Sequence, residues 1–146
     1  DEIRVLDDQQ IQHPLELLKP IVKLKEILQA VDDVKHIYIS PAVKRYVVEL
    51  TTRTRQSEDV YLGASPRGSL SLARAGQARA AMLGRDHVLP DDIQALAVAV
   101  LAHRIIVSPA ARLRDLSSDR IVQEAIYATS VPGGEFASET ARKKIR

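Results

Sequence analysis

Four of the seven dipeptides that end in proline mark expected helix starts in this chain, and they constrain its fold more than any other feature. In three of them a serine stands directly before the proline, at Ser40-Pro41, Ser65-Pro66 and Ser108-Pro109. Serine is a favoured N-cap residue, and proline is favoured in the first helical turn because it has no N–H to lose there. Two aspartates directly follow the fourth step, Leu89-Pro90, where carboxylates favour the positive end of a helix dipole. The sequence therefore predicts a series of helices with defined starting points.

Apolar residues recur with a helical period along most of the chain. Spacings of three and four residues place them on one face of a helix, which is the face that packs against a core. We place five helices, over about 23–34, 41–55, 66–83, 90–104 and 119–129. Ser118 is the expected N-cap of the last one. Their expected core residues are Leu24, Ile27, Leu28, Val31 and Val34, then Val43, Tyr46, Val47 and Leu50, then Ile93, Leu96, Ala97, Val100 and Leu101, and finally Ile121, Val122, Ala125 and Ile126.

The expected helix over 66–83 differs from the others because small residues surround it on every side. They are Ala73, Ala75, Gly76, Ala78, Ala80 and Ala81. Small side chains let neighbouring helices approach closely, so we expect this helix to be the central one. Gly84 is placed to end it. Most of its apolar bulk is expected to come from four larger side chains, those of Leu70, Leu72, Met82 and Leu83.

Short β-branched runs precede three of the helix starts, within residues 36–43, 86–90 and 103–111. β-branched side chains favour extended backbone, so we expect these segments to pair with one another while they lead into the helices. The fold class that follows is all-α, a small helical bundle with short extended segments before its helix starts.

The chain divides into three expected parts. Residues 1–22 lack a sustained period and contain two prolines, so we expect an extended leading segment. Residues 23–132 carry all of the expected helices and form the helical domain. Residues 133–146 are rich in Gly, Ser and charged residues, and we expect a disordered basic tail.

Composition excludes several classes of protein. The chain has 146 residues, of which 45% are apolar and 27% charged, enough for one domain with a core. The absence of cysteine excludes disulfides, cysteine-ligated zinc, iron–sulfur clusters and thiol catalysis. No apolar run approaches the ~20 residues of a membrane-spanning helix, and no secretory signal is visible, so we expect a cytoplasmic protein. Because the chain begins at Asp1 and its only methionine is Met82, we expect a piece of a longer polypeptide.

The net charge of +2 comes entirely from the last twelve residues of the chain. Residues 1–134 contain 17 basic and 17 acidic residues, whereas the residues after them contain four basic and two acidic ones. A neutral body with 3% aromatic residues favours a solvated face over a nucleic-acid site, which normally concentrates basic and aromatic side chains. A DNA-binding module that uses Arg67, Arg74 and Arg79 stays an alternative. Arg53 and Arg55, at the end of the preceding helix, are the other arginines considered for such a site.

The sequence contains no recognisable catalytic set. No glycine is followed by lysine, so the phosphate-binding loop G-x-x-x-x-G-K-[ST] is missing. Ser65 stands in a pattern close to the nucleophile elbow G-x-S-x-G, but the second glycine is one residue late and a proline follows, so a helix cap is favoured. The four histidines, at positions 13, 36, 87 and 103, are far apart, and we expect no metal site.

Arg67 is the residue that we single out for function. It occupies the second position of the helix that begins at Ser65-Pro66. Free backbone N–H groups and the helix dipole favour an anion at that end, and a guanidinium fork suits a phosphate. The residues by themselves leave an ordinary exposed arginine as an equal alternative.

Three stretches together resemble the C-terminal lid of MoxR-type AAA+ ATPases. They are residues 61–70 with Gly-Ala-Ser-Pro-Arg, residues 84–93 with Gly-Arg-Asp-x-Val-x-Pro-x-Asp-Ile, and residues 100–108 with Val-Leu-x-His-Arg. Residues 13–20 and the helix start after Tyr38 are also similar to the family, so the resemblance runs in order from about residue 13 to Pro132. Leu89 departs from the pattern, since the family commonly has Thr or Ser at this cap position.

The resemblance implies a lid that packs on an ATPase core belonging to a longer protein. Arg67 would then be sensor 2, reaching the γ-phosphate of ATP, with Ser65 and Pro66 supporting the helix start. ATP and Mg would be bound mainly by the core, and the parent protein would hydrolyse ATP. The resemblance further implies a ring of subunits, typically a hexamer, that assembles or activates client proteins like a chaperone, with a von Willebrand A-domain protein as a possible partner. A free-standing helical protein-interaction module is the other alternative.

Overall fold

The computed structural model describes Ile3 and residues 14–132, and the chain divides into two compact units, residues 1–32 and 33–146. The first unit contains a short 3-10 helix, η1 (Pro14–Leu17), within the leading segment. Helix α2 (Leu24–Lys35) follows and confirms the first expected helix. None of the residues of α2 is buried, so its expected core residues are wrong. A helical stripe identifies the side that can pack against a partner, but it does not say whether the same segment of chain supplies the partner.

In the second unit, α3 (Pro41–Gln56) begins at the first Ser-Pro step. The Ser40 Oγ accepts a hydrogen bond from the Val43 N–H at 3.2 Å, so the serine caps the helix as expected. The predicted core face is also confirmed, because Val43, Tyr46, Val47 and Leu50 are all buried.

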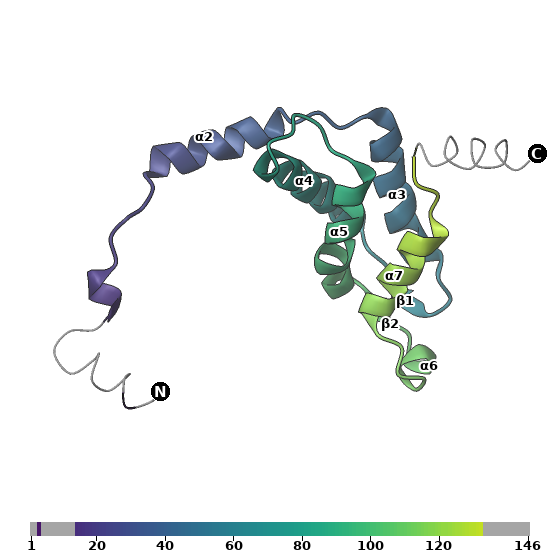
Figure 1. Ribbon diagram of the computed structural model, residues 1–146. Coiled ribbons are helices and arrows are strands. Elements are labelled where there is room, and N and C mark those ends of the chain that lie inside the picture. The colour runs from purple at the N-terminus through teal and green to yellow at the C-terminus, as the bar shows by residue number, and fades with distance from the viewer. Residues whose placement is uncertain (1–2, 4–13, 133–146) are drawn as a thin grey trace, which may run out of the picture. The chain divides into compact units, whose positions relative to one another are not determined.

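Helix α4 (Pro66–Met82) packs through small residues against α3 and α5 (Pro90–Leu101) (Figure 1). Its buried residues follow at every fourth position: Gly68, Leu72, Gly76 and Ala80. A Cβ added at Gly76 would lie only 2.7 Å from the Ile93 Cδ1, so the glycine permits the close approach of α5. The prediction that this helix is the central one is wrong, because α4 packs mainly against α3 and α5, whereas α5 packs against α3, α4 and α7 (Ser118–Ala128).

The larger side chains of α4 do not supply its packing in the way that we expected. Of the four, only Leu72 is buried, and Leu70, Met82 and Leu83 are exposed. The buried stripe repeats every four residues from Gly68, and these three side chains lie off it. The helix ends as predicted, with Gly84 at a φ of 71°, in the left-handed region that favours glycine.

Extended segments pair on two sides of the bundle. Strand β1 (Val60–Leu62) pairs antiparallel with β2 (Ile106–Val107). Tyr38 forms a parallel bridge with His87, in which the Tyr38 N–H donates to the Asp86 carbonyl oxygen at 2.8 Å and the Val88 N–H donates to the Tyr38 carbonyl oxygen at 2.9 Å. The prediction that the extended segments pair with one another is thereby confirmed for residues 36–43 and 86–90, whereas the segment within 103–111 pairs with β1, which the sequence did not predict.

The last part of the described chain completes the bundle. The 3-10 turn η2 (Ala102–Arg104) follows α5, and the short helix α6 (Pro109–Arg112) begins at the third Ser-Pro step. Helix α7 (Ser118–Ala128) then packs Ile121, Val122 and Ala125 into the core. Its N-cap is Ser117 and not Ser118, because the Ser117 Oγ accepts a hydrogen bond from the Arg120 N–H at 3.3 Å.

These elements confirm the fold class, an all-α bundle with short extended segments before helix starts. The domain limits that we expect from the sequence stay a prediction, and the tail over 133–146 lies outside the described residues. Within the described part of the chain, no helix has the length and apolar character that crossing a membrane requires.

A candidate anion site at the start of helix α4

The loop before α4 is held tightly against the end of α3. A Cβ at Gly63 would lie 2.6 Å from the Thr54 carbonyl oxygen and 2.7 Å from backbone atoms of Arg55, so only glycine permits this approach. Ala64, which is fully buried, is bound at both of its backbone polar groups. Its N–H donates to the Thr54 Oγ1 at 3.1 Å, and its carbonyl oxygen accepts from the Arg55 Nη1 at 2.7 Å. The position of the next residues is therefore fixed by the core.

The start of α4 differs from that of α3 although both follow a Ser-Pro step. Ser65 occupies the N-cap position with extended backbone, but its side chain makes no capping hydrogen bond. The Gly68 N–H, which a capping serine would usually satisfy, donates instead to the Ser65 carbonyl oxygen at 2.7 Å. The expected side-chain cap is thus absent, and the Ser65 hydroxyl is not used to satisfy the helix start.

Arg67 projects from this helix start and is exposed. Among the described residues it has no hydrogen-bond acceptor and no carboxylate partner, and the first turn of α4 contains no acidic residue. A guanidinium with all of its donors available therefore stands at the positive end of a 17-residue helix. Such an arrangement can bind an anion that another domain or molecule presents.

The first turn of α4 also packs against α3 and α5. Thr51 Oγ1 and Ser69 Oγ form a hydrogen bond at 2.7 Å between α3 and α4. A Cβ at Gly68 would lie 3.2 Å from the Leu101 Cδ2, so the end of α5 lies against the first turn of α4. The Gly-Ala-Ser-Pro-Arg and Val-Leu-x-His-Arg motifs therefore meet at the first turn of α4, which is the turn that carries Arg67.

The remaining motif forms an ion-pair junction at the other end of α4. The buried Asp92 carboxylate accepts hydrogen bonds from the Arg85 Nη1 at 2.8 Å and from the Arg85 Nη2 at 2.6 Å, and the Arg79 Nε lies 3.3 Å from it. The hydrogen bonds from Arg85 hold the pKa of the Asp92 carboxyl below its usual range. Sequence reasoning assigned Asp92 only to the helix start and missed this junction.

Asp92 also explains how Leu89 can stand at a cap position. The Leu89 N–H donates to the Asp92 Oδ2 at 2.9 Å, so the aspartate in the first turn reaches back to the residue that precedes the helix. The departure from the family pattern at Leu89 is therefore offset by an acceptor that the motif itself supplies.

Three of the five arginines considered for nucleic-acid binding are engaged within the chain. Arg53 forms an ion pair with Glu49 at 3.1 Å, Arg79 lies against Asp92, and Arg55 donates to the Ala64 carbonyl oxygen and to Thr52. Only Arg67 and Arg74 of this set lack a partner among the described residues. These engagements do not favour a concentrated basic surface.

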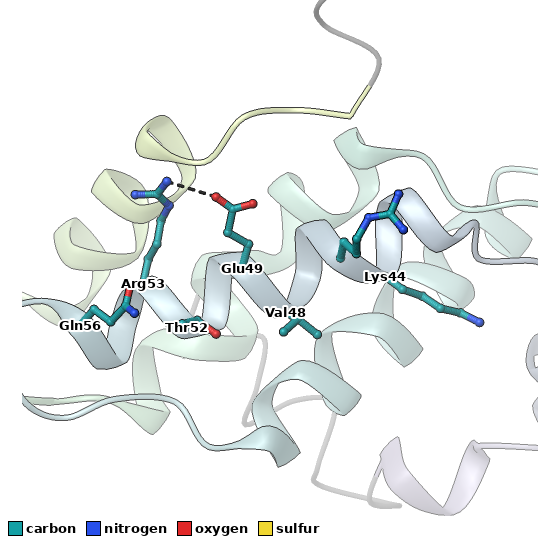
Figure 2. A pocket seen from close by; sticks show the side chains of 7 residues that line it. Lys44, Val48, Glu49, Thr52, Arg53 and Gln56 are labelled. Atoms are coloured by element: carbon teal, nitrogen blue, oxygen red, sulfur yellow. Dashed lines mark hydrogen bonds and ion pairs between the residues drawn. The ribbon is translucent and has the colours of Figure 1, made fainter.

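A groove of about 470 Å³ follows the outward face of α3, as Figure 2 shows. It is lined by Lys44, Arg45, Val48, Glu49, Thr52, Arg53 and Gln56. The ion pair between Glu49 and Arg53 spans one turn of the helix within this groove. All of these residues come from a single helix, and Arg67 is not among them.

The histidines do not gather into a ligand set. His87 Nδ1 lies 2.8 Å from the Asp86 Oδ1, and His103 Nδ1 lies 3.1 Å from the Ala99 carbonyl oxygen. His13 lies outside the described residues. Within the part of the chain that the structure describes, no group of three or more His, Cys, Asp or Glu side chains could hold a metal ion.

This chain is similar in sequence to a known domain family and to known proteins. Residues 52–125 match the family described as the AAA lid domain. The chain is 39% identical over 132 residues to an uncharacterized protein, YeaC, of Bacillus subtilis (strain 168), covering 90% of this chain and 41% of YeaC. It is 27% identical over 123 residues to the chaperone MoxR1 of Mycobacterium tuberculosis, covering 78% of this chain and 33% of MoxR1.

A solved structure gives the same result at the level of the fold. The crystal structure of a proposed ATPase from Cytophaga hutchinsonii matches with a TM-score of 0.77 and 25% sequence identity, over 89% of this chain and 42% of that one. This chain therefore spans less than half the length of each of these three proteins.

Proposed function

Because this chain belongs to the AAA lid domain family and is a lid of the MoxR type, we propose that it couples the ATP state of an ATPase core to movement of the lid. The residue that carries the coupling is Arg67, acting as sensor 2 on the γ-phosphate of ATP. The single observation that supports this role most is the unpartnered Arg67 guanidinium at a helix start whose serine makes no side-chain cap.

Each residue near Arg67 has a defined part in this mechanism. Gly63 and Ala64 fix the loop against α3, so the start of α4 moves together with the rest of the bundle. Arg67 then transmits any force between the phosphate and the lid to a rigid body. Ser65 and Pro66 end the extended segment and set the direction of the helix without occupying its anion-binding end.

The attraction between the Arg67 guanidinium and the γ-phosphate would drive the cycle of lid closing and opening. Before hydrolysis, the Arg67 guanidinium donates to the γ-phosphate and holds the lid against the core. After hydrolysis and phosphate release, this contact is lost and the lid is free to move. ATP and Mg would be held mainly by the core domain, where Mg neutralises phosphate charge, while this chain contributes the arginine.

The wider function is also part of the proposal. We expect the parent protein to hydrolyse ATP as a ring, typically a hexamer, in the cytoplasm, where ATP is available. The name of the mycobacterial relative, a chaperone, supports chaperone-like assembly or activation of client proteins. A von Willebrand A-domain protein is the partner that the resemblance to the MoxR type suggests.

The test is ATP turnover by the full-length protein that contains this chain. We expect Arg67→Ala to lower turnover by about 10- to 100-fold, as expected for the loss of a hydrogen bond to a charged group worth ~1.5–3 kcal/mol. Arg74→Ala is the matched control. Arg74 is exposed and unpartnered on the same helix, seven residues further on, which places it on the same face about 10 Å from Arg67.

The control defines the result that would contradict the proposal. Arg74→Ala removes the same charge from the same helix face, so a general electrostatic effect would lower turnover in both variants. Equal turnover in Arg67→Ala and the wild-type protein, or equal losses in the two variants, would remove Arg67 from the mechanism.

A further inference from the structure

Arg104 lies beside the first turn of α4. A Cβ added at Gly68 would lie 3.9 Å from the Arg104 Cδ, which is an ordinary van der Waals distance. Gly68 directly follows Arg67 in the chain, so the stem of Arg104 lies against the helical turn that carries Arg67. Two arginines that are 37 positions apart in the sequence are thereby brought to the same end of α4.

The orientation of Arg104 is fixed through one of its nitrogen atoms. The Arg104 Nε donates to the Val100 carbonyl oxygen at 3.0 Å, at the end of α5 where carbonyl groups lack helical partners. This bond uses one of the five N–H donors of a guanidinium. The terminal Nη1 and Nη2 groups have no acceptor among the described residues, and the side chain is exposed.

The charge at this end of α4 is uncompensated. Within the described chain, carboxylates lie against Arg53, Arg79, Arg85, Arg114 and Arg120. Neither Arg67 nor Arg104 has such a partner, and the first turn of α4 has no acidic residue. Two like charges near the positive end of a helix raise the local potential, and an anion bound there would relieve their repulsion.

We propose that Arg104 is a second phosphate-binding residue, which contacts the polyphosphate of the bound nucleotide together with Arg67. This inference rests on the proposed function of the lid. The fork formed by Nη1 and Nη2 suits phosphate oxygens, and the bond from Nε to Val100 holds the fork in place before the nucleotide arrives. Arg104 thus joins the end of α5 to the nucleotide.

Arg104→Gln separates the binding role from the helix-capping role. The glutamine Nε2 stands at the same place along the side chain as the arginine Nε, so it can still donate to the Val100 carbonyl oxygen. The variant loses only the charge and the terminal donors. Arg104→Lys does the reverse, because it keeps the charge and loses the Nε donor. Arg112→Gln, at an exposed and unpartnered arginine of α6, is the control.

The measurement is the Kd of the full-length protein for a non-hydrolysable ATP analogue, with the thermal midpoint of each variant recorded alongside. We expect Arg104→Gln to raise the Kd by about tenfold at an unchanged midpoint, in line with the loss of a charge-assisted contact. Arg104→Lys should lose less affinity, and Arg112→Gln should bind like the wild-type protein.

Other outcomes separate this inference from the proposed function. If Arg67→Ala weakens binding while Arg104→Gln binds like the wild-type protein, Arg104 is only a helix cap and the inference is overturned, but the proposed function stands. If Arg104→Gln and Arg112→Gln raise the Kd equally, the effect is a general loss of positive charge and the inference also fails. If neither Arg67→Ala nor Arg104→Gln changes the Kd, both proposals fail.

Discussion

Replacing Asp92 by asparagine removes a negative charge from the junction between α4 and α5 and leaves the shape of the side chain almost unchanged. The Asp92 side chain is only 2% exposed, while those of Arg85 and Arg79 are 24% and 41% exposed. The variant therefore leaves two arginines beside a buried amide that can satisfy only part of their donors. Asp91, the adjacent and exposed aspartate, provides the matched control Asp91→Asn.

The loss in free energy of unfolding depends on how well the guanidinium groups of Arg85 and Arg79 can be hydrated once Asp92 no longer carries a charge. Removing one partner of a fully buried ion pair costs about 3–5 kcal/mol. Because Arg79 is largely exposed, its ion pair with Asp92 contributes little to the free energy of unfolding. The asparagine oxygen can also still accept the hydrogen bond from the Leu89 N–H. We therefore expect Asp92→Asn to lower the free energy of unfolding by about 2–3 kcal/mol, and the thermal midpoint by ~10–20 °C in a domain of this size.

The pH dependence gives a second, independent readout. The pKa of the folded Asp92 carboxyl is lowered, chiefly by the hydrogen bonds from Arg85, whereas in the unfolded chain it titrates near ~3.9. The unfolded state therefore binds the proton first as the pH falls. The stabilisation by Asp92 is complete above about pH 5 and declines below ~3.9, as the pH falls through the folded pKa.

The assay is urea unfolding of the 146-residue chain at pH 7 and at several acidic values. The stability difference between the wild-type chain and Asp92→Asn should be largest at pH 7 and should shrink below about pH 4. Asp91→Asn should stay within about 0.5 kcal/mol of the wild-type chain. Equal losses in the two variants, or a difference that does not change with pH, would refute the assignment of the junction.

Two further predictions concern the two serines and the glycine that precede the helices. Ser40→Ala should lower the free energy of unfolding by about 1 kcal/mol because it removes a cap hydrogen bond, whereas Ser65→Ala should change it by less than about 0.5 kcal/mol. Equal losses in urea unfolding would contradict the difference between these caps. Gly63→Ala should cost at least about 1–3 kcal/mol, because its Cβ would meet backbone atoms of α3 that cannot turn away. A thermal midpoint equal to that of the wild-type chain would show that the loop is not held as tightly as we describe.

Local sequence signals were sufficient to place the helices. Proline fixes the first turn of α3, α4, α5 and α6. The first three begin at the residues predicted for them, and α6 begins at the third Ser-Pro step although it is not one of the five helices that we placed. Gly84 ends α4 for an equally local reason, since its positive φ favours glycine. The exposed position of Arg67 at a helix start follows directly from Ser65-Pro66 and needs no knowledge of tertiary structure.

Features that depend on distant contacts could not be predicted in this way. Asp92 looks like a residue of a helix start, and only the turn between α4 and α5 brings Arg79 and Arg85 against it. Leu70 and Met82 look like core residues, but the contact between α4 and α5 selects a stripe that begins at Gly68. In each case the deciding neighbour belongs to another element.

The same Ser-Pro dipeptide can also produce helix starts that are capped in different ways. Ser40 and Ser65 both precede a proline, yet of the two only the Ser40 Oγ accepts a capping hydrogen bond. The difference arises because the Gly68 N–H is already satisfied by the Ser65 carbonyl oxygen. Strand β1 went unpredicted for a similar reason, since its three residues become a strand only by pairing with β2.

The central claim is that Arg67 distinguishes ATP from ADP, and the most direct test compares the affinities of the full-length protein for the two nucleotides. In Arg67→Ala, we predict that the Kd for a non-hydrolysable ATP analogue rises by about tenfold or more, because a contact to a charged phosphate is lost, while the Kd for ADP stays within about twofold. An equal loss of affinity for both nucleotides, or unchanged affinity for the ATP analogue, would contradict the claim.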